Sequence, residues 1–571
     1  MDKAATLCAR GRPRGDAPRC SVIKDLWYKN AIIYSLNVGT FMDSNGDGIG
    51  DFVGLMRRLD YLAGLGVTCL WLMPFQTSPR RDDGYDISDY YSVDPSFGSL
   101  GDFVDFTHEA RQRGIRVIID LVVNHTSNKH PWFLEARRDK RSRYRDFYVW
   151  SDKKPKNAHT GMVFPGVQKT TWTYDREARA YYFHRFYDFQ PDLNTANPEV
   201  MAELRKVMGY WLQLGVDGFR MDAIPFVIER QGAGAKPGLH YSMLRDMREF
   251  IQWRRGDAMI LAEANVLPKT NVHYFGEDGD RMHMLFNFQV NQAVFYGLAT
   301  ADTRPLVRAL EATRERPVNA QWGHFLRNHD ELDLGRLTEA QRARVFEAFG
   351  PDKDMQLYHR GIRRRLAPML NGDRRRLELA YSLLFALPGT PVIRYGDEIG
   401  MGDDLRLPER NCARTPMQWS TEPQAGFSRA KKLTLPVISR GPYSYERVNA
   451  ADQRADSDSL LNWTERMIRM RKEVPEIGWG DFKVIDAGQP GVLALHYRWR
   501  NDEVLTIHNL RDDSVPARVH LPGEGGKTIV SLFTHERSVN ERGRHEIMLK
   551  PYGYAWYRLG GLGYLLDRSD D

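Results

Sequence analysis

Short apolar strands alternate with amphipathic helices from about residue 27 to residue 400. Helix-like stretches such as PEVMAELRKVMGYWLQLG (198–215) lie between the strands. Repeated strand–helix units predict a parallel sheet, and this many units predict a closed (β/α)8 TIM barrel. The strand-like runs are AIIYSLNV (31–38), TCLWLMPF (68–75), IRVIIDLVVNH (115–125), VDGFRMD (216–222), MILAEAN (259–265), HFLRNHD (324–330) and TPVIRYGDE (390–398).

Two segments interrupt this pattern. Residues 126–189 are rich in aromatic, lysine and turn residues, and a connection of this length predicts a small inserted domain that helps to build a binding site. After about residue 480, short alternating strands predict an antiparallel β-sandwich. We therefore expect a disordered tail (1–24), a barrel (25–125 and 190–480), an inserted domain (126–189) and a C-terminal sandwich (481–571).

Composition narrows the class of protein only slightly. The net charge is +7 over 571 residues, which is too dilute to indicate a nucleic-acid partner. No run of 18 apolar residues predicts a membrane span. The four cysteines form neither a disulfide framework nor a zinc cluster, which fits a reducing compartment, and the cytoplasm is the expected location. Whether the chain forms a homo-oligomer stays open.

Polar side chains gather at the carboxyl ends of the predicted strands, where TIM barrels carry their chemistry. Three carboxylates of this set would share one pocket, although unpaired carboxylates repel each other. Glycoside hydrolysis needs such a set, because one carboxylate attacks the anomeric carbon and a protonated one donates to the leaving oxygen. The strand-end residues are Asp120, Asn124, His125, Arg220, Asp222, Glu263, His329 and Asp330.

The motifs around these residues resemble the sequence blocks of the α-amylase family. The similarity implies that Asp222 is the nucleophile, Glu263 the acid/base and Asp330 the third carboxylate, which stabilises the transition state. The reaction would retain the α configuration through a covalent glucosyl intermediate, with no organic cofactor. The matching blocks are DLVVNH (120–125), QPDLN (190–194), GFRMDA (218–223), AEAN (262–265), RNHDE (327–331) and GTPVIRYGDEIGM (389–401).

The same resemblance implies a pocket for one terminal glucose. In RDDGYDISDY (81–90), Tyr85 would stack on the sugar, and Asp82 would bind its far hydroxyls and pair with an arginine, expected to be Arg414. This pair would exclude longer chains and make the enzyme exo-acting. The other residues implied to bind the sugar are His125, Phe189, Arg220, Phe226, Asn265, His329, Glu331 and Arg410.

The loop DSNGDGIGD (43–51) places oxygen ligands at alternate positions. The expected ligands of a structural Ca²⁺ or Mg²⁺ are Asp43, Asn45, Asp47 and Asp51, with the backbone carbonyl of Ile49. The twelfth position is Gly54 and not glutamate, so the loop is not an EF-hand. A glycine-rich turn without a metal is the alternative.

Within the family, several stretches resemble the trehalose synthases, which interconvert maltose and trehalose. They include HPWF (130–133), FYVWSD (147–152), GIRRRLAP (361–368) and RTPMQWS (414–420). The chain departs from them at Phe226, where they have tyrosine, and at Gly335, where they have glutamate. Both departures would remove hydrogen bonds to the acceptor sugar.

Two alternative functions therefore stay open. The first is an α-glucosidase acting on small α-glucosides, with transfer to another acceptor. The second is a non-catalytic, amylase-like heavy chain of a membrane transporter. Such heavy chains typically carry a membrane anchor and lose catalytic carboxylates, whereas this sequence predicts no anchor and keeps all three carboxylates.

Overall fold

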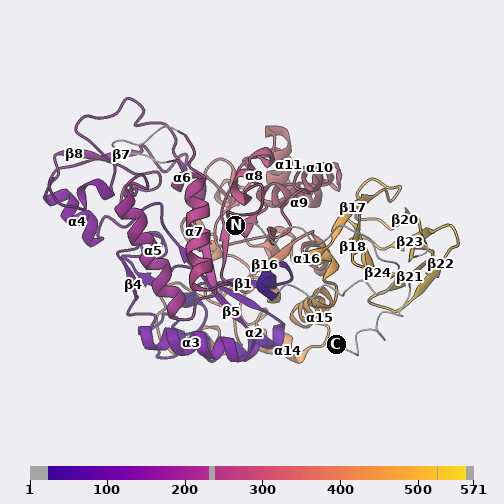
Figure 1. Cartoon of the computed structure of the whole chain (residues 1–571). Coiled ribbons are helices and arrows are strands. Elements are labelled where there is room, and N and C mark those ends of the chain that lie inside the picture. The colour runs from indigo at the N-terminus through magenta and orange to yellow at the C-terminus, as the bar shows by residue number, and fades with distance from the viewer. Residues whose placement is uncertain (1–23, 230–237, 524, 561–571) are drawn as a thin grey trace.

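Eight parallel strands close into a barrel in the computed structural model, which describes residues 24–229, 238–523 and 525–560 (Figure 1). Consecutive barrel strands are neighbours, and β16 pairs with β1 to close the ring. This confirms the predicted (β/α)8 barrel. The strands are β1 (Ile33–Leu36), β2 (Cys69–Leu72), β5 (Arg116–Leu121), β9 (Gly218–Met221), β10 (Met259–Ala262), β11 (Met284–Phe286), β12 (Gln321–Phe325) and β16 (Thr390–Arg394).

The helices around the barrel bury one face each. In α5 (Pro198–Gln213), the buried positions Val200, Leu204, Val207 and Trp211 follow helical periodicity and form one apolar stripe. The helix α3 (Leu100–Gln112) begins at a Ser99 capping box. Other long helices are α7 (Ser242–Arg254), α9 (Phe288–Thr300), α10 (Arg304–Ala312), α11 (Glu339–Phe349), α13 (Arg374–Ala386) and α15 (Leu460–Glu473), and shorter ones include α2 (Leu59–Leu65), α6 (Ile224–Val227) and α8 (Pro268–Phe275).

One barrel strand lies outside the predicted runs. The strand β11 has three residues, Met284–Phe286, which is too short to show a periodicity. Its residues Met284 and Phe286 are buried inside the barrel with Trp71 and Phe325. Tertiary packing therefore makes this segment a strand, although its own sequence pattern does not.

The inserted segment contains a small antiparallel sheet next to the barrel (Figure 1). Its strands are β6 (Trp150–Ser151), β7 (Trp172–Asp175) and β8 (Ala180–Phe183), in the order β6-β8-β7, and it is preceded by α4 (Pro131–Arg138). A second small sheet follows β12 and consists of β13 (Leu332–Asp333), β14 (Gln356–Leu357) and β15 (Gly361–Ile362). Residues 161–164, between β6 and β7, and Asp333 of β13 contribute to the walls of the site described below.

The C-terminal strands form an antiparallel domain that lies at the opposite end from the inserted segment (Figure 1). A six-stranded sheet contains β17 (Asp481–Ile485), β18 (Val492–Trp499), β19 (Asp502–Asn509), β24 (Tyr554–Leu559), β21 (Thr528–Ser531) and β22 (Arg537–Val539). A pair, β20 (Val515–His520) and β23 (Arg544–Leu549), packs on it through alternating buried residues such as Val519 and Ile547. The predicted antiparallel domain is thus confirmed.

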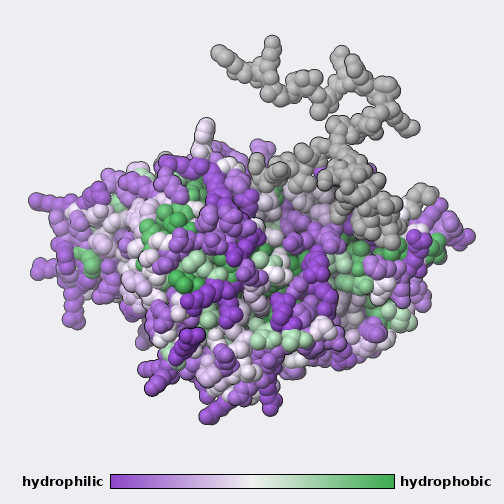
Figure 2. Space-filling view, turned by 90° about the horizontal axis from the view of Figure 1, so that it is seen from below, coloured by the Kyte–Doolittle hydropathy of each residue, from purple (hydrophilic) through white to green (hydrophobic). Residues whose placement is uncertain are grey.

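The predicted tail (1–24) lies outside the described residues except for Lys24. Among the helices of the described ranges, none has the length and apolar content that a membrane span requires. The face shown in Figure 2 is mostly hydrophilic, with hydrophobic residues in patches between the polar ones. Exposed apolar residues of this kind are normal on a protein surface.

Candidate active site

The predicted catalytic carboxylates line one cavity of about 560 Å³ at the carboxyl ends of the barrel strands. Asp222 directly follows β9, Glu263 directly follows β10, and Asp330 lies five residues beyond the end of β12. Each comes from a different part of the chain, and parallel strands bring them to the same end of the barrel. Segments of the inserted domain and of the second small sheet complete the walls.

Arg220 connects the carboxylates. Its Nη1 donates to Asp222 Oδ1 at 2.6 Å and to Asp120 Oδ1 at 2.6 Å, and its Nη2 donates to Glu263 Oε2 at 2.7 Å. The guanidinium is 1% exposed. One fixed cation therefore holds the predicted nucleophile and the predicted acid/base close together, as a retaining glycosidase requires.

Asp120 belongs to this network, although the set of expected catalytic and sugar-binding residues did not include it. Its side chain is buried and accepts hydrogen bonds from Arg220, from Trp71 Nε1 at 2.8 Å and from Tyr85 Oη at 3.2 Å. Its position at a strand end was visible in the sequence. What the sequence did not show is that Asp120 faces Arg220 and is the third carboxylate bonded to it, beside Asp222 and Glu263.

The carboxylates differ in their protonation. Burial raises the pKa of Glu263 to about 7, and the charges of Asp222 and Asp330 add to this effect against that of Arg220. Burial raises the pKa of Asp222 to about 6, with Arg220 opposing and Asp120 reinforcing the shift. The proton therefore resides preferentially on Glu263, which gives it the form of a general acid beside an ionised nucleophile.

Two arginine cations and the ring nitrogen of His329 surround Asp330 and hold it in its ionised form. Arg410 Nη1 lies 2.5 Å and Arg414 Nη2 lies 3.2 Å from Asp330 Oδ1, and His329 Nε2 lies 3.1 Å from Oδ2. Although burial acts in the opposite direction, these neighbours hold the pKa of Asp330 well below its usual range. A permanent negative charge here can stabilise positive charge that develops on a sugar.

The two histidines and Tyr85 form the base of the cavity. Tyr85 Oη lies 2.8 Å from His329 Nε2, and His125 Nε2 lies 3.1 Å from the backbone oxygen of Tyr85. Burial lowers the pKa of His125 and of His329 to about 4. Both rings are therefore neutral near pH 7 and offer one N–H donor each.

The predicted pairing of Asp82 with Arg414 is wrong. Asp82 Oδ1 lies 3.0 Å from Arg410 Nη2, and Asp82 Oδ2 accepts a hydrogen bond from Gln190. Arg414 instead pairs with Asp83 at 3.1 Å. Because Arg410 also reaches Asp330, one guanidinium closes this end of the cavity by bridging two carboxylates.

Phe189 does not reach the catalytic cavity. It lines a neighbouring cavity of about 600 Å³ on the other side of the Asp82–Arg410 pair. Its ring is stacked on Tyr187 with a centroid separation of 5.1 Å, and Arg81 lies 3.8 Å from its centroid. With Tyr187 and Arg81 packed against it, the ring supports the wall of this neighbouring cavity.

The remaining predicted residues line the opposite end of the cavity. Phe226 packs edge-to-face on Phe186, and Asn265 Nδ2 donates to Asp333 Oδ2 at 3.3 Å. Burial raises the pKa of Glu331 to about 7, and its Oε2 is buried without a hydrogen-bond partner in the described part of the chain. Asp333 itself had not been predicted as a site residue.

The predicted cation loop is closed by its own hydrogen bonds. The carboxylate of Asp43 accepts from the backbone N–H groups of Asn45, Gly46 and Gly48, and from Ser428 Oγ. Within the described ranges, no group of three or more His, Cys, Asp and Glu side chains is arranged to hold a metal. The loop does offer the amide oxygen of Asn45 and a carbonyl at Ile49 beside its carboxylates, which is a donor set that suits a hard cation.

This geometry defines a carboxylate-based glycosidase or transglucosidase site on a TIM barrel. Residues 36–349 and 362–480 match the family described as alpha amylase, catalytic domain, and the chain belongs to that family. Residues 502–558 match a second description, sucrose hydrolase-like, C-terminal domain. The chain is therefore an enzyme of the α-amylase family.

Trehalose synthases and an α-glucosidase are among the proteins that are similar to this chain. The chain is 46% identical to a trehalose synthase of Thermus thermophilus over 94% of its own length, and it spans 56% of that protein. It is 41% identical to a trehalose synthase/amylase of Mycolicibacterium smegmatis, with 93% and 92% of the two chains covered. It is 32% identical to an α-glucosidase of Pediococcus pentosaceus, with 93% and 99% covered.

A solved structure of similar shape is the α-amylase from H. orenii. It superimposes with a TM-score of 0.74 and 28% identity, covering 93% of this chain and 99% of the other. The fold of this chain is therefore similar to that of this α-amylase over almost the whole length of both chains.

Proposed function

We propose that the enzyme interconverts maltose and trehalose by an exo-acting, retaining transfer of one α-glucosyl group. The observation that carries this proposal is the single guanidinium of Arg220 that joins Asp222 and Glu263 in a cavity closed at one end by Asp82 and Arg410. Such a pocket accommodates one terminal glucose. The similarity to trehalose synthases supports the choice of substrates.

In this proposal the reaction has two steps, and Asp222 and Glu263 act in both. In the first, Asp222 attacks the anomeric carbon while Glu263 gives its proton to the glycosidic oxygen, so that glucose leaves and a β-glucosyl–Asp222 ester forms. In the second, Glu263 takes the proton of the anomeric hydroxyl of the freed glucose, whose oxygen attacks the glucosyl carbon and releases Asp222. Asp330 and Arg220 stabilise the charges that develop in both steps.

Incubation with maltose followed by chromatography tests the proposal. Trehalose as the main product is expected, and the variant Asp222→Ala should give no product while remaining folded. Asp217→Asn is a suitable control, because Asp217 is a buried, ion-paired carboxylate that lies just before β9 and outside the cavity lining. Glucose alone as the product would exclude the isomerase.

An α-glucosidase with transfer activity is the second candidate. Phe226 and Gly335 favour it, because neither side chain offers a hydrogen bond to an acceptor sugar at the open end of the cavity. The similarity to an α-glucosidase agrees with this candidate. Mixed or longer glucosides among the products from maltose would identify the transferase.

We also propose that the loop 43–51 binds a structural Ca²⁺ or Mg²⁺. The alternating oxygen donors support this, and the exposed side chains of Asn45 and Asp47 would have to turn toward the ion. Calcium should raise the temperature of unfolding, and Asp47→Ala should remove this effect. A melting temperature that does not respond to calcium or to EDTA would contradict the proposal.

The cellular location and the assembly state are proposals as well. A reducing, cytoplasmic location is consistent with Cys69 and Cys412, which are both buried and unpaired. Fractionation of the native host would test it. A homo-oligomer stays an open prediction that sedimentation can decide.

A further inference from the structure

Three consecutive arginines, residues 363–365, directly follow β15 and bind one loop at the closed end of the catalytic cavity. This loop, residues 403–414, follows β16 and carries Arg410, which closes the cavity. A run of basic residues usually lies on a solvated face. Here Arg363 is only 8% exposed and Arg365 is fully buried, so the run belongs to the interior of the protein.

Arg363 holds the part of the loop that directly precedes Arg410. Its guanidinium donates to three backbone oxygens at alternate positions, from Nη2 to Leu405 at 2.8 Å and from Nη1 to Leu407 at 2.7 Å and Glu409 at 2.9 Å. The planar fork of an arginine can make several such bonds at once, whereas a lysine ammonium is a single point charge. The path of the loop up to Arg410 therefore depends on one guanidinium.

The residue before Arg410 has a strained backbone conformation. Glu409 has a φ of +44°, in the left-handed region, which is roughly tenfold less favourable for a residue other than glycine. Its backbone oxygen accepts the bond from Arg363, and its Oε2 accepts one from Tyr187 Oη at 3.0 Å. A return to a right-handed φ would turn the chain at this point and move Arg410 away from Asp82.

The other two arginines of the run hold the two ends of the same loop. At its start, the carboxylate of Asp403 accepts a hydrogen bond from the backbone N–H of Arg365 at 2.9 Å and pairs with Arg364 Nε at 3.3 Å. At its end, the backbone oxygen of Ala413 accepts a hydrogen bond from Arg365 Nε at 3.1 Å. Three neighbouring residues thus bind the loop at its start, in its middle and at its end.

A further buried arginine connects the loop to the catalytic segment after β12. Arg394 is the last residue of β16 and is 1% exposed. Its Nη1 donates to the backbone oxygen of Asn328 at 2.8 Å, and its Nη2 donates to that of Ala413. Asn328 lies two residues before Asp330, and Ala413 lies one residue before Arg414. The two segments are therefore held together through their backbones, beside the side chains that pair.

We propose that the three arginines, residues 363–365, are positioning residues that set the path of the loop 403–414 and thereby restrict the cavity to one terminal glucose. They hold the backbone on both sides of Arg410, so that its guanidinium reaches both Asp82 and Asp330. This inference rests on the proposed exo-acting function, and it names the residues that determine the length of the sugar chain the enzyme accepts.

The test compares kcat/KM for maltose with kcat/KM for maltotriose, and it measures the loss of substrate. Arg363→Lys should lower the ratio of the two values roughly three- to tenfold, because one ammonium cannot bond three carbonyls and Glu409 loses the contact that offsets its strained φ. Arg364→Gln removes only the pair with Asp403 and should lower the ratio roughly twofold. If Arg363→Lys fails to fold, Arg364→Gln carries the test. An unchanged ratio in the folded variant would overturn the inference.

A double variant separates an effect through Arg410 from a general loosening of the fold. In Arg410→Gln the pair with Asp82 is already absent, so adding Arg363→Lys should leave the ratio as it is in Arg410→Gln alone. If Arg363→Lys lowers the ratio equally in both backgrounds, Arg363 does not act through Arg410, and the inference is wrong.

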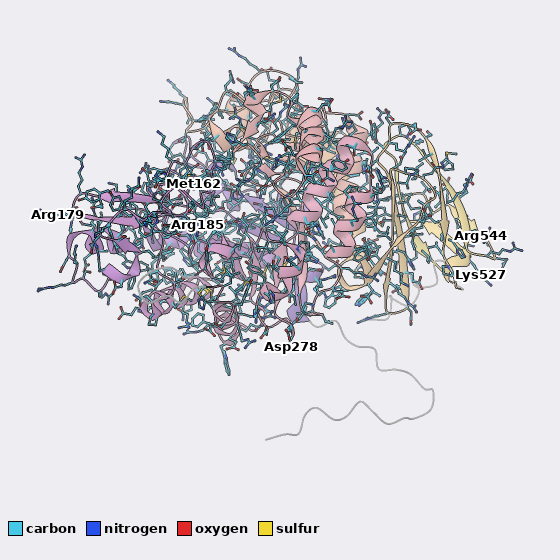
Figure 3. All side chains as sticks on the ribbon, turned by 90° about the horizontal axis from the view of Figure 1, so that it is seen from above. Met162, Arg179, Arg185, Asp278, Lys527 and Arg544 are labelled. Atoms are coloured by element: carbon cyan, nitrogen blue, oxygen red, sulfur yellow. The ribbon has the colours of Figure 1, made fainter. Side chains whose placement is uncertain are left out.

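Arg248→Lys is the matched control. Arg248 is also a buried arginine that donates to a loop carbonyl, that of Gly279, and it does not line the catalytic cavity. Figure 3 shows Asp278 of that loop apart from Met162 and Arg185, which line the cavity. The control should keep the wild-type ratio. An equal decrease in Arg248→Lys would overturn the inference, because any buried arginine would then have the same effect.

Hydrogen–deuterium exchange measures the loop directly. The amides of Leu407 and Asn411 are bonded to backbone oxygens within the loop, and they should exchange faster in Arg363→Lys than in wild type and in Arg248→Lys. Equal exchange in all three proteins would show that Arg363 does not hold the loop, and the inference would be wrong.

The same kinetics judge the proposed function separately. Loss of substrate does not depend on whether trehalose or glucose forms, so the identity of the product does not enter this comparison. A wild type that uses maltotriose as readily as maltose would contradict the exo-acting pocket and, with it, this inference. A preference for maltose that Arg363→Lys retains in full would contradict this inference alone.

Discussion

The variant Asp120→Asn tests the electrostatics of the site directly. Asp120 and Asp222 both accept a hydrogen bond from the same nitrogen of Arg220 at 2.6 Å, so these two carboxylate oxygens lie at most about 5 Å apart. At an effective dielectric constant of about 20, two charges at this distance repel by about 3 kcal/mol, which corresponds to about two pKa units. Removing the charge of Asp120 should therefore favour the ionised form of Asp222.

The expected readout is the acidic limb of the pH profile of kcat/KM with maltose. In the wild type, activity should fall below about pH 6 as Asp222 becomes protonated, and above about pH 7 as Glu263 loses its proton. In Asp120→Asn, the acidic limb should move about one to two units toward lower pH. The maximal rate should also fall, because Trp71 and Tyr85 lose a charged acceptor.

Asp217→Asn provides the control, because it removes a buried, arginine-paired carboxylate that does not contact Arg220. Its acidic limb should coincide with that of the wild type. The reasoning would be refuted if Asp120→Asn were active and its acidic limb also coincided with the wild type, because the group titrating there would then not be coupled to Asp120.

Three further predictions concern the acid, the closed end and the C-terminal domain. Glu263→Gln should lower kcat/KM for maltose by about 10²- to 10⁴-fold. The decrease in kcat/KM for an aryl glucoside with a good leaving group should be much smaller, and steady-state kinetics with both substrates will measure it. Arg410→Gln should raise KM for maltose and lower the ratio of kcat/KM for maltose to kcat/KM for maltotriose, because the pair with Asp82 no longer closes the cavity. An unchanged ratio would contradict this role of Arg410. Arg558→Met should destabilise the fold by about 3–5 kcal/mol in denaturant unfolding, since it leaves Glu476 buried and without this partner, and adding Glu476→Leu should recover part of the loss.

Much of the fold was predictable because the spacing of apolar residues within each element can be read directly from the sequence. Seven barrel strands and six C-terminal strands stand out as runs of the right length. The exception in the barrel is β11, with three residues, whose burial among Trp71, Phe325 and their neighbours exists only after the barrel has closed. In the C-terminal domain, β17 and β22 also lie outside the predicted runs. A strand this short is specified by its neighbours and not by its own pattern.

The site was predictable wherever a strand places its last residues at the barrel end. Asp222, Glu263 and Asp330 therefore converge as expected. The pairing of Asp82 was not predictable in the same way, because Arg410 and Arg414 are four residues apart around a 3-10 helix, η6 (Glu409–Ala413), and both point to the same wall. The path of that loop determines which arginine pairs with which aspartate. Within the loop, Glu409 has a left-handed φ of 44°, which the sequence alone does not predict.

The acceptor end of the cavity contains residues that do not lie at the ends of barrel strands, and these could not be predicted from strand positions. Arg185 comes from the inserted domain and Arg360 from the loop between β14 and β15, and neither lies at a barrel strand end. In sequence they are two unremarkable arginines, and their partners Glu229 and Asp333 lie 44 and 27 positions away. The predicted bond-breaking residues thus lie at the strand ends, whereas the walls of the acceptor end consist of loops that only the folded chain brings together.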